Sequence, residues 1–268
     1  MKTINRQIFC IIILLAVSFF TIQAQQQEKN LKLYLNFEQL ENDSVKDVTG
    51  NGYNGILKNG ASVKKIGQHH VLDLGNNDGY LDFEQSVGRL IVSLKDFTIS
   101  TCLYIGQEVD LSTYGNFVWA FSTQEYCTAA GGEYIAYRVN TQRYEQSTGG
   151  WEHEVVGIQT GKPAAKGKWQ YIVYTQSEST GTLYVDGQVA ATGKASVQPK
   201  DMTAPPVFNW LGRAPFKGDA YLKSTIYYDF KIYDKALSVN EINESMACMD
   251  FFEEINHADE EQKITFHE

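Results

Sequence analysis

The sequence predicts an all-β fold in which two antiparallel sheets pack as a sandwich. Strand-like alternation of apolar and polar residues recurs along the chain, for example in KLYLNF, FTISTCLYI and QYIVYTQ. Clusters of Gly, Asn, Asp and Ser separate these segments, as turns between strands require. Aromatic residues are 13% of the chain, and they suit the half-buried face of a pleated sheet. We therefore expect many short strands and little helix.

The expected strands alternate with turns, so that neighbouring segments can pair. Asp186 and Gly187 form a two-residue turn inside LYVDGQVA, which is the strongest short-range signal of a β-hairpin. In KWQYIVYT at least one face of the strand is buried against the opposite sheet, and Trp169 is expected in the core. The expected strands are residues 32–37, 70–74, 79–83, 97–105, 116–121, 133–139, 153–158, 170–176, 181–187, 207–212 and 225–233.

One short helix is expected near the end of the chain. Ser238 precedes Glu241 by three residues, which is the spacing of a capping box. Apolar residues from Ile242 onward follow at helical spacing, so the helix should close the domain near Phe252. Residues 244–268 are interpreted as the end of this helix and an acidic tail.

The first 24 residues have the order of a secretory signal peptide. Lys2 and Arg6 precede the apolar run IFCIIILLAVSFF, and small residues follow before QQQEK. Residues 1–24 are therefore interpreted as a signal peptide and residues 25–243 as one domain. The apolar run is shorter than the ~20 residues of a membrane span, so no membrane insertion is expected. The mature chain is expected to be secreted or periplasmic, or to be held at the cell surface.

The charge of the chain excludes one class of partner. Loss of Lys2 and Arg6 with the signal peptide changes the formal net charge from −9 to −11. Such an acidic surface repels nucleic acid and anionic lipid. Glycans, cations or other exported proteins are the expected partners.

Three cysteines remain after the signal peptide, namely Cys102, Cys127 and Cys248, so at least one thiol is free. Cys102 is interpreted as a small buried apolar residue, and Cys127, in the loop QEYCTAAGG, as an exposed thiol. No disulfide framework is expected.

Four long runs carry a resemblance to a known family. They are LYLNFEQLENDSVKDVTGNGYNGIL, DFTISTCLYI, GKWQYIVYTQSESTGTLYVDGQVAA and NWLGRAPFKGDAYLKSTIYYDFKIYDKALSVNEI. Their order resembles that of a laminin-G-like, concanavalin A-like jelly-roll domain, over about residues 31–243. The variant with NFVWAFS is similar to modules attached to glycan-degrading enzymes of Bacteroidetes. The resemblance implies a two-sheet antiparallel jelly roll and a role in binding.

The turn DVTGNGYNG is a candidate metal site. It leads into a strand rather than a helix, so it does not suit a phosphate. Calcium needs about six to eight oxygen ligands, and the resemblance implies Glu38, Asp47 and Asn51 as ligands of a structural calcium ion. The family pattern has a further Asp at the position that Tyr228 occupies in this chain, and Asp229 follows one residue later. Two alternatives follow: the site is lost, or a bulge turns Asp229 inward.

A catalytic function is disfavoured. Glucanases with this fold carry Glu, apolar, Asp, apolar, Glu along one strand, so that both acids enter the cleft. In EVDLS the second Glu is replaced by Ser112, which leaves only Glu108 and Asp110. No catalytic residues are therefore assigned.

Aromatic and planar polar side chains are the candidates for sugar binding, because sugars stack on rings and bond through paired hydroxyls. Phe117, Trp119 and Phe121 are predicted on one strand face, too crowded for one core layer. For Trp119 and Trp210 a place in the core is the alternative. The candidates are Trp119, Tyr137, Arg138, Trp151, His153, Trp210 and Arg213.

The sequence thus indicates an exported, non-catalytic binding module that recognises a carbohydrate. Two alternatives stay open: a structural or protein-interaction domain of a glycan-utilisation system, and a glycoside hydrolase. A glycan array would separate sugar binding from protein interaction.

Overall fold

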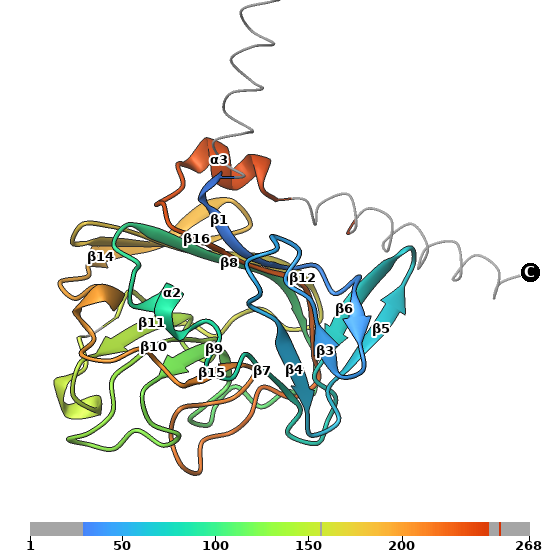
Figure 1. The fold of residues 1–268 in the computed structure, drawn as a ribbon, viewed down its shortest axis with the longest axis horizontal. Coiled ribbons are helices and arrows are strands. Elements are labelled where there is room, and N and C mark those ends of the chain that lie inside the picture. Colours follow the sequence, from blue (N-terminus) through green and yellow to red (C-terminus); the bar gives the residue numbers. More distant parts are fainter. Residues whose placement is uncertain (1–28, 156, 247–251, 253–268) are drawn as a thin grey trace, which may run out of the picture.

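The computed structural model describes residues 29–155, 157–246 and 252, which form a sandwich of two antiparallel sheets (Figure 1). We call them sheets A and B; within the described residues each contains eight strands. The all-β, two-sheet fold predicted from the sequence is confirmed. The predicted signal peptide, residues 1–24, and most of the predicted tail lie outside the described residues.

Sheet A has the strand order β14–β13–β12–β8–β16–β6–β5, and β1 pairs with β16 beside this path. The predicted hairpin joins β13 to β14, where Asp186 and Gly187 both have positive φ. The strands are β1 (Leu31–Leu35), β5 (Ser62–Ile66), β6 (His69–Asp73), β8 (Phe97–Ile105), β12 (Trp169–Ser177), β13 (Thr180–Val185), β14 (Gln188–Lys194) and β16 (Thr225–Tyr233).

Sheet B has the strand order β11–β10–β9–β15–β7–β4–β3–β2. Its strands are β2 (Leu40–Glu41), β3 (Ser44–Val45), β4 (Gly55–Lys58), β7 (Tyr80–Asp82), β9 (Phe117–Ser122), β10 (Tyr134–Arg138), β11 (Arg143–Ser147) and β15 (Phe208–Leu211). The helical segments are α2 (Gly88–Ile91), α3 (Val239–Glu244) and two 3₁₀ turns, η1 (Trp151–His153) and η2 (Pro199–Asp201). Among the described residues no helix has the length and apolar character to cross a membrane.

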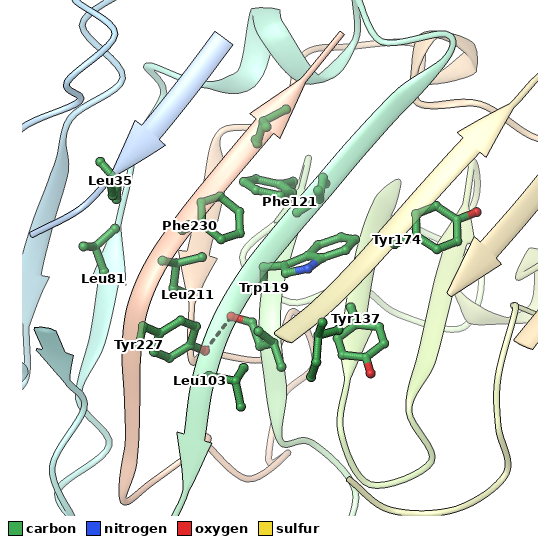
Figure 2. Packing of buried hydrophobic residues seen from close by; sticks show 14 of the residues in the cluster. Leu35, Leu81, Leu103, Trp119, Phe121, Tyr137, Tyr174, Leu211, Tyr227 and Phe230 are labelled. Atoms are coloured by element: carbon green, nitrogen blue, oxygen red, sulfur yellow. Dashed lines mark hydrogen bonds between the residues drawn. The ribbon is translucent and has the colours of Figure 1, made fainter. Parts of the chain in front are cut away.

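The core fills the space between the two sheets (Figure 2). Leu103 and Phe230 of sheet A and Phe121 of sheet B are fully buried there. The Tyr227 hydroxyl donates a hydrogen bond of 2.8 Å to the carbonyl oxygen of Val118 across the core. This bond ties the two sheets together and satisfies a phenol that would otherwise be costly to bury.

The prediction that Phe117, Trp119 and Phe121 share one face of a strand is wrong. The register between β9 and β10 shifts at Val118, which forms a bulge. Phe117 is thereby turned to the outer face of sheet B, where it packs with Tyr134, whereas Trp119 and Phe121 enter the core. One extra residue thus relieves the crowding of aromatic rings that the alternation implies.

A second apolar cluster covers the outer face of sheet A and includes α3. The predicted capping box is confirmed, because Ser238 and Glu241 bond each other's backbone N–H. Trp169 is only half-buried and stacks on Phe252 with ring centroids 5.7 Å apart. Its predicted place between the sheets is wrong, because Trp169 lies on the strand face that points away from the other sheet, like Tyr171.

Cys102 is buried, as predicted, whereas the state of Cys127 differs from the prediction. Cys102 is disulfide-bonded, with a partner outside the described residues. Cys127 is free, as one thiol must be, but it is buried rather than exposed. Burial raises the pKa of the Cys127 thiol to about 12, which keeps it protonated and unreactive.

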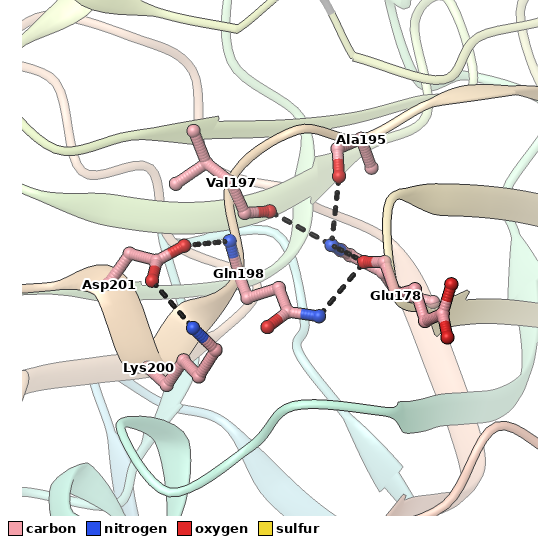
Figure 3. A network of polar contacts seen from close by, with 7 residues as sticks. Glu178, Ala195, Val197, Gln198, Lys200 and Asp201 are labelled. Carbon is pink, nitrogen blue, oxygen red and sulfur yellow. Dashed lines mark hydrogen bonds and ion pairs between the residues drawn. The ribbon is translucent and has the colours of Figure 1, made fainter.

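A polar network fixes the chain where it leaves sheet A for sheet B (Figure 3). The buried side-chain amide of Gln176 donates to the carbonyl oxygens of Val197 at 2.9 Å and Ala195 at 3.3 Å. Gln198 donates to the carbonyl oxygen of Glu178 at 2.9 Å. These bonds place the connection rigidly, although it has no strand structure of its own.

Candidate functional site

Asp47 anchors the turn DVTGNGYNG. Its Oδ1 accepts hydrogen bonds from the backbone N–H groups of Tyr34 and Thr49, both at 3.1 Å, and its Oδ2 accepts one from Tyr53 at 3.2 Å. The Thr49 hydroxyl donates to the same carboxylate at 2.8 Å. Asp47 is buried, and these donors occupy the lone pairs that a calcium ion would need.

Glu38 and Asn51 have separate partners. Asn51 donates from its side chain to the carbonyl oxygen of Lys32 at 2.9 Å. Glu38 accepts a hydrogen bond of 3.0 Å from the backbone N–H of His70, and its other oxygen lies 2.6 Å from the His70 Nδ1. The described part of the chain contains no group of three or more His, Cys, Asp or Glu side chains that could hold a metal ion.

Asp229 lies at a bulge in β16, so the bulge that one alternative predicted is present. Its carboxylate nevertheless has other partners: Oδ1 accepts a hydrogen bond of 2.8 Å from the backbone N–H of Cys102, and Oδ2 lies 2.7 Å from the Lys231 Nζ. The extra residue, Tyr228, leaves the Cys102 N–H without a ladder partner, and Asp229 supplies one. The four predicted ligands therefore do not fit one calcium site.

Melting experiments can test whether a structural calcium ion binds at these residues. Because Glu38, Asp47, Asn51 and Asp229 are all engaged elsewhere, we expect the same melting temperature with calcium and with a chelator. A clear fall in chelator would show that these side chains rearrange around a cation.

The outer face of sheet B carries a cluster of charged side chains at β10 and β11. Arg138 Nε and Arg143 Nε lie 3.4 and 3.3 Å from Glu145 Oε2, and Arg143 also pairs with Glu154. Neither contact has hydrogen-bond geometry. Among the described residues, both arginine Nε atoms and Glu145 Oε1 therefore lack a hydrogen-bond partner. Burial raises the pKa of Glu145 to about 6, although the two guanidinium groups oppose this shift.

An aromatic cluster adjoins these charges. Trp151, in η1, is 49% exposed and packs edge-on against Phe216, with ring centroids 5.9 Å apart. Phe216 in turn contacts Tyr134, whose hydroxyl donates to Glu154 at 2.6 Å. An open tryptophan ring is thus joined through Tyr134 to the charged cluster around Arg143.

Arg213 lies in a cage of aromatic rings on the same face of sheet B. Its Cζ is 4.0 Å from the ring centroid of Trp210 and 5.1 Å from that of Tyr80, within cation–π range. Tyr126 and Tyr221 complete the cage at 5.7 and 5.8 Å. Glu125 closes it with an ion pair of 2.7 Å. The Arg213 guanidinium is nearly buried and holds the loops that carry Tyr126 and Tyr221 beside Trp210.

The structure divides the predicted sugar ligands into three groups. Trp119 and Tyr137 are in the core between the sheets, so they cannot stack on a sugar from outside. Trp210 faces outward, but Arg213 covers it. The accessible candidates on the outer side of sheet B are Arg138, Trp151 and His153.

Sequence reasoning missed Phe216, Glu145 and Tyr126. Glu145 lies in RYEQS, a polar stretch without the apolar alternation that reveals strands. Phe216 and Tyr126 lie in loops, and only tertiary contacts bring them to this face. A signal was present for Phe216, because it is a single large apolar residue in the polar loop RAPFKGDA.

The stretch EVDLS lies in a loop rather than on a strand, as the family resemblance implies. Asp110 accepts hydrogen bonds from the Ser112 N–H and hydroxyl at 2.8 and 2.6 Å. The Ser112 hydroxyl and the Ser224 side chain lower the pKa values of Asp110 and Glu108 below their ordinary range. Both carboxylates are therefore ionised at neutral pH.

Comparison with solved structures gives the same fold at low sequence identity. Domain 4 of AbnA, a GH43 extracellular arabinanase from Geobacillus stearothermophilus, in complex with arabinotriose, matches with a TM-score of 0.61 and 13% identity, over 80% of this chain and 97% of that domain. The binding domain of Paraclostridial Mosquitocidal Protein 1 matches with a TM-score of 0.56 and 17% identity, over 81% of this chain and 52% of the other.

Trypanosoma rangeli sialidase in complex with sialic acid matches with a TM-score of 0.58 and 17% identity, over 84% of this chain but only 34% of the sialidase. No curated protein matches the chain. The sequence model described as the concanavalin A-like lectin/glucanases superfamily matches residues 75–243. Together with the two-sheet sandwich, this match shows that the chain belongs to the concanavalin A-like lectin/glucanase superfamily.

Proposed function

We propose that this chain is an exported, non-catalytic module that binds a carbohydrate on the outer face of sheet B. The observation that carries the proposal is the half-exposed ring of Trp151 beside an incompletely bonded Arg–Glu cluster. A sugar needs both parts, because its C–H face stacks on a ring and its hydroxyls bond planar polar groups.

Arg138 offers the polar part of this site. Its Nε faces Glu145 without forming a hydrogen bond, and its side chain keeps 13% of its surface exposed. A guanidinium held on one side by a carboxylate is fixed in orientation, so its free edge can bond a pair of sugar hydroxyls. Glu145 lies beneath Arg138 and Arg143 and is almost fully buried, which suits a positioning role better than contact with a glycosidic bond.

The neighbouring structures support a binding role in the same direction. One is a complex with arabinotriose, another is a sialidase in complex with sialic acid, and a third is the binding domain of a mosquitocidal protein. The second candidate is a protein-interaction domain, in which the exposed aromatic face contacts a protein. A glycan array with the mature chain separates the two, because a protein-interaction domain binds no sugar on it.

Replacement of Trp151 by alanine tests the site. Stacked aromatic residues at binding sites contribute one or more kcal/mol, so Trp151→Ala should weaken binding of an array-identified glycan about tenfold. The ring is half-exposed in a loop, so stability should change by no more than about 0.5 kcal/mol. Calorimetric titration gives the affinity and thermal melting the stability.

Val189→Ala is the matched control, because it removes an exposed apolar side chain from sheet A. It should leave glycan affinity unchanged. Unaltered affinity in Trp151→Ala would place the ligand elsewhere, and a large loss of stability would show that the ring belongs to the core.

A further inference from the structure

A cavity of about 310 Å³ lies between the loop of residues 106–116 and residues 220–224. This volume falls at the small end of the ~300–1,000 Å³ range of small-molecule sites. Six of the residues that line it carry the chemistry: Glu108, Asp110, Asn116, Ala220, Tyr221 and Lys223. Trp151, Arg138 and Glu145 are not among the residues that line it. The cavity is therefore distinct from the aromatic and charged clusters near Trp151.

The wall of the cavity is held by backbone bonds between its two segments. Gly115 and Ala220 form a parallel bridge. The Asn116 N–H donates to the Ala220 carbonyl oxygen at 2.9 Å, and the Ala220 N–H donates to the Tyr114 carbonyl oxygen at 3.0 Å. Gly115 has φ of 104°, and a Cβ there would lie 2.3 Å from the Ala220 carbonyl oxygen. Only glycine permits this close approach of the two backbone segments.

Hydrogen-bond acceptors gather on one side of the cavity. Glu108 and Asp110 both line the cavity, and the Asp110 carboxylate accepts hydrogen bonds from the Ser112 N–H and hydroxyl. Asn116 is only 1% exposed, and its Nδ2 donates to the Asp110 carbonyl oxygen at 3.2 Å. A ligand rich in hydroxyl donors satisfies this set, because carboxylates form strong charge-assisted bonds with hydroxyls.

Aromatic rings accompany the acceptors. Tyr221 lines the cavity, and Tyr114, on the same loop as Asp110, is 77% exposed. An aromatic ring left so open favours contact with the apolar face of a ligand. The two carboxylates repel an anion, and Lys223 is already paired with Asp78 at 2.8 Å. The ligand that fits hydrogen-bond acceptors, the Tyr221 ring and this charge is a neutral sugar.

We propose that this cavity is a second binding site, which holds a single residue of a neutral sugar. The site rests on its own residues and shares only the class of ligand with the site at Trp151. Its carboxylates accept hydrogen bonds from hydroxyls of the sugar, and Tyr221 contacts its C–H face.

The test uses the mature chain and a panel of free monosaccharides at millimolar concentration: arabinose, xylose, galactose and glucose. Backbone amide shifts in a two-dimensional NMR spectrum report where each sugar binds. We expect saturable shifts for Ser112, Asn116 and Ala220 with at least one sugar. Movement of the Trp151 indole signal would report the separate site on the outer face of sheet B, because Trp151 does not line the cavity.

The double variant Glu108→Gln/Asp110→Asn should weaken this binding at least about tenfold, since the amides replace charged acceptors by neutral ones. Asp43→Asn, an exposed carboxylate that does not line the cavity, is the matched control and should bind as the unaltered chain does.

Absence of shifts at the cavity residues with every sugar would overturn the proposal. Equal affinity in the double variant and the control would do so as well. Neither result bears on the proposed site at Trp151, because the glycan array and the Trp151→Ala variant test that site separately. Conversely, shifts confined to Trp151 would support the outer face of sheet B and reject the cavity.

Discussion

Trp119→Ala should lower the free energy of unfolding by roughly 3–5 kcal/mol, the range for loss of a large aromatic side chain from a packed core. Trp119 is 2% exposed and contacts three other rings in the core. Its ring centroid lies 5.7 Å from that of Phe121, 5.9 Å from Tyr144 and 6.2 Å from Tyr137 (Figure 2). None of these neighbours can fill the space, because each is itself wedged between the sheets. Denaturant titration measures the effect.

Trp119→Phe is the companion variant, since it keeps a ring in the cavity and should lose less than half as much stability. A loss under about 1 kcal/mol for Trp119→Ala would mean that the site collapses freely and that the ring is not central to the core.

Asp229→Asn should also be strongly destabilising, by roughly 3–5 kcal/mol, because it leaves a buried lysine without its partner. The Lys231 and Asp229 side chains are 6% and 1% exposed. Burial opposes the charge on Lys231, but Asp229 and the surrounding tyrosines outweigh it and raise the lysine pKa above its ordinary value. Asp43→Asn, at an exposed position, should change stability little.

The pH dependence of the Asp229→Asn variant gives a sharper test. Without Asp229, burial should depress the Lys231 pKa in the folded state below that of the unfolded chain. The unfolded state then binds more protons between these two pKa values, so the variant should gain stability as pH rises through that interval. Asp229→Asn/Lys231→Met should recover much of the loss, because no unpaired charge remains buried. A double variant as unstable as the single one would show that the ion pair is not the cause.

The sequence predicts the β class and the C-terminal capping box because local patterns determine both. The Asp186–Gly187 turn and the Ser238–Glu241 pair each act over a few residues, and the structure contains both. The strand predicted at residues 153–158 is wrong: η1 occupies its start, and an isolated bridge from Val155 to Gln146 replaces a strand. The strand in this region is β11, whose outward residues are polar and therefore lack a period-two apolar signal.

The candidate site is less predictable than the fold, since it depends on two features without a local signature. The bulge at Val118 moves Trp119 into the core and Phe117 out of it. The loop containing Phe216 then covers Phe117 and meets Trp151. Alternation along one strand cannot reveal a one-residue shift, and contacts between distant loops leave no pattern in the sequence.

The position of β16 sets the order in which the chain can fold. This strand comes near the end of the sequence, yet it lies between β8 and β6 and also pairs with β1 near the beginning (Figure 1). Sheet A therefore cannot close until residues up to Tyr233 are free to pair. If the chain crosses a membrane N-terminus first, sheet A stays incomplete until β16 has crossed as well. The chain therefore stays in a form that can pass through a narrow channel until then. Such non-local pairing also slows folding, because distant segments must meet before any of their contacts is gained.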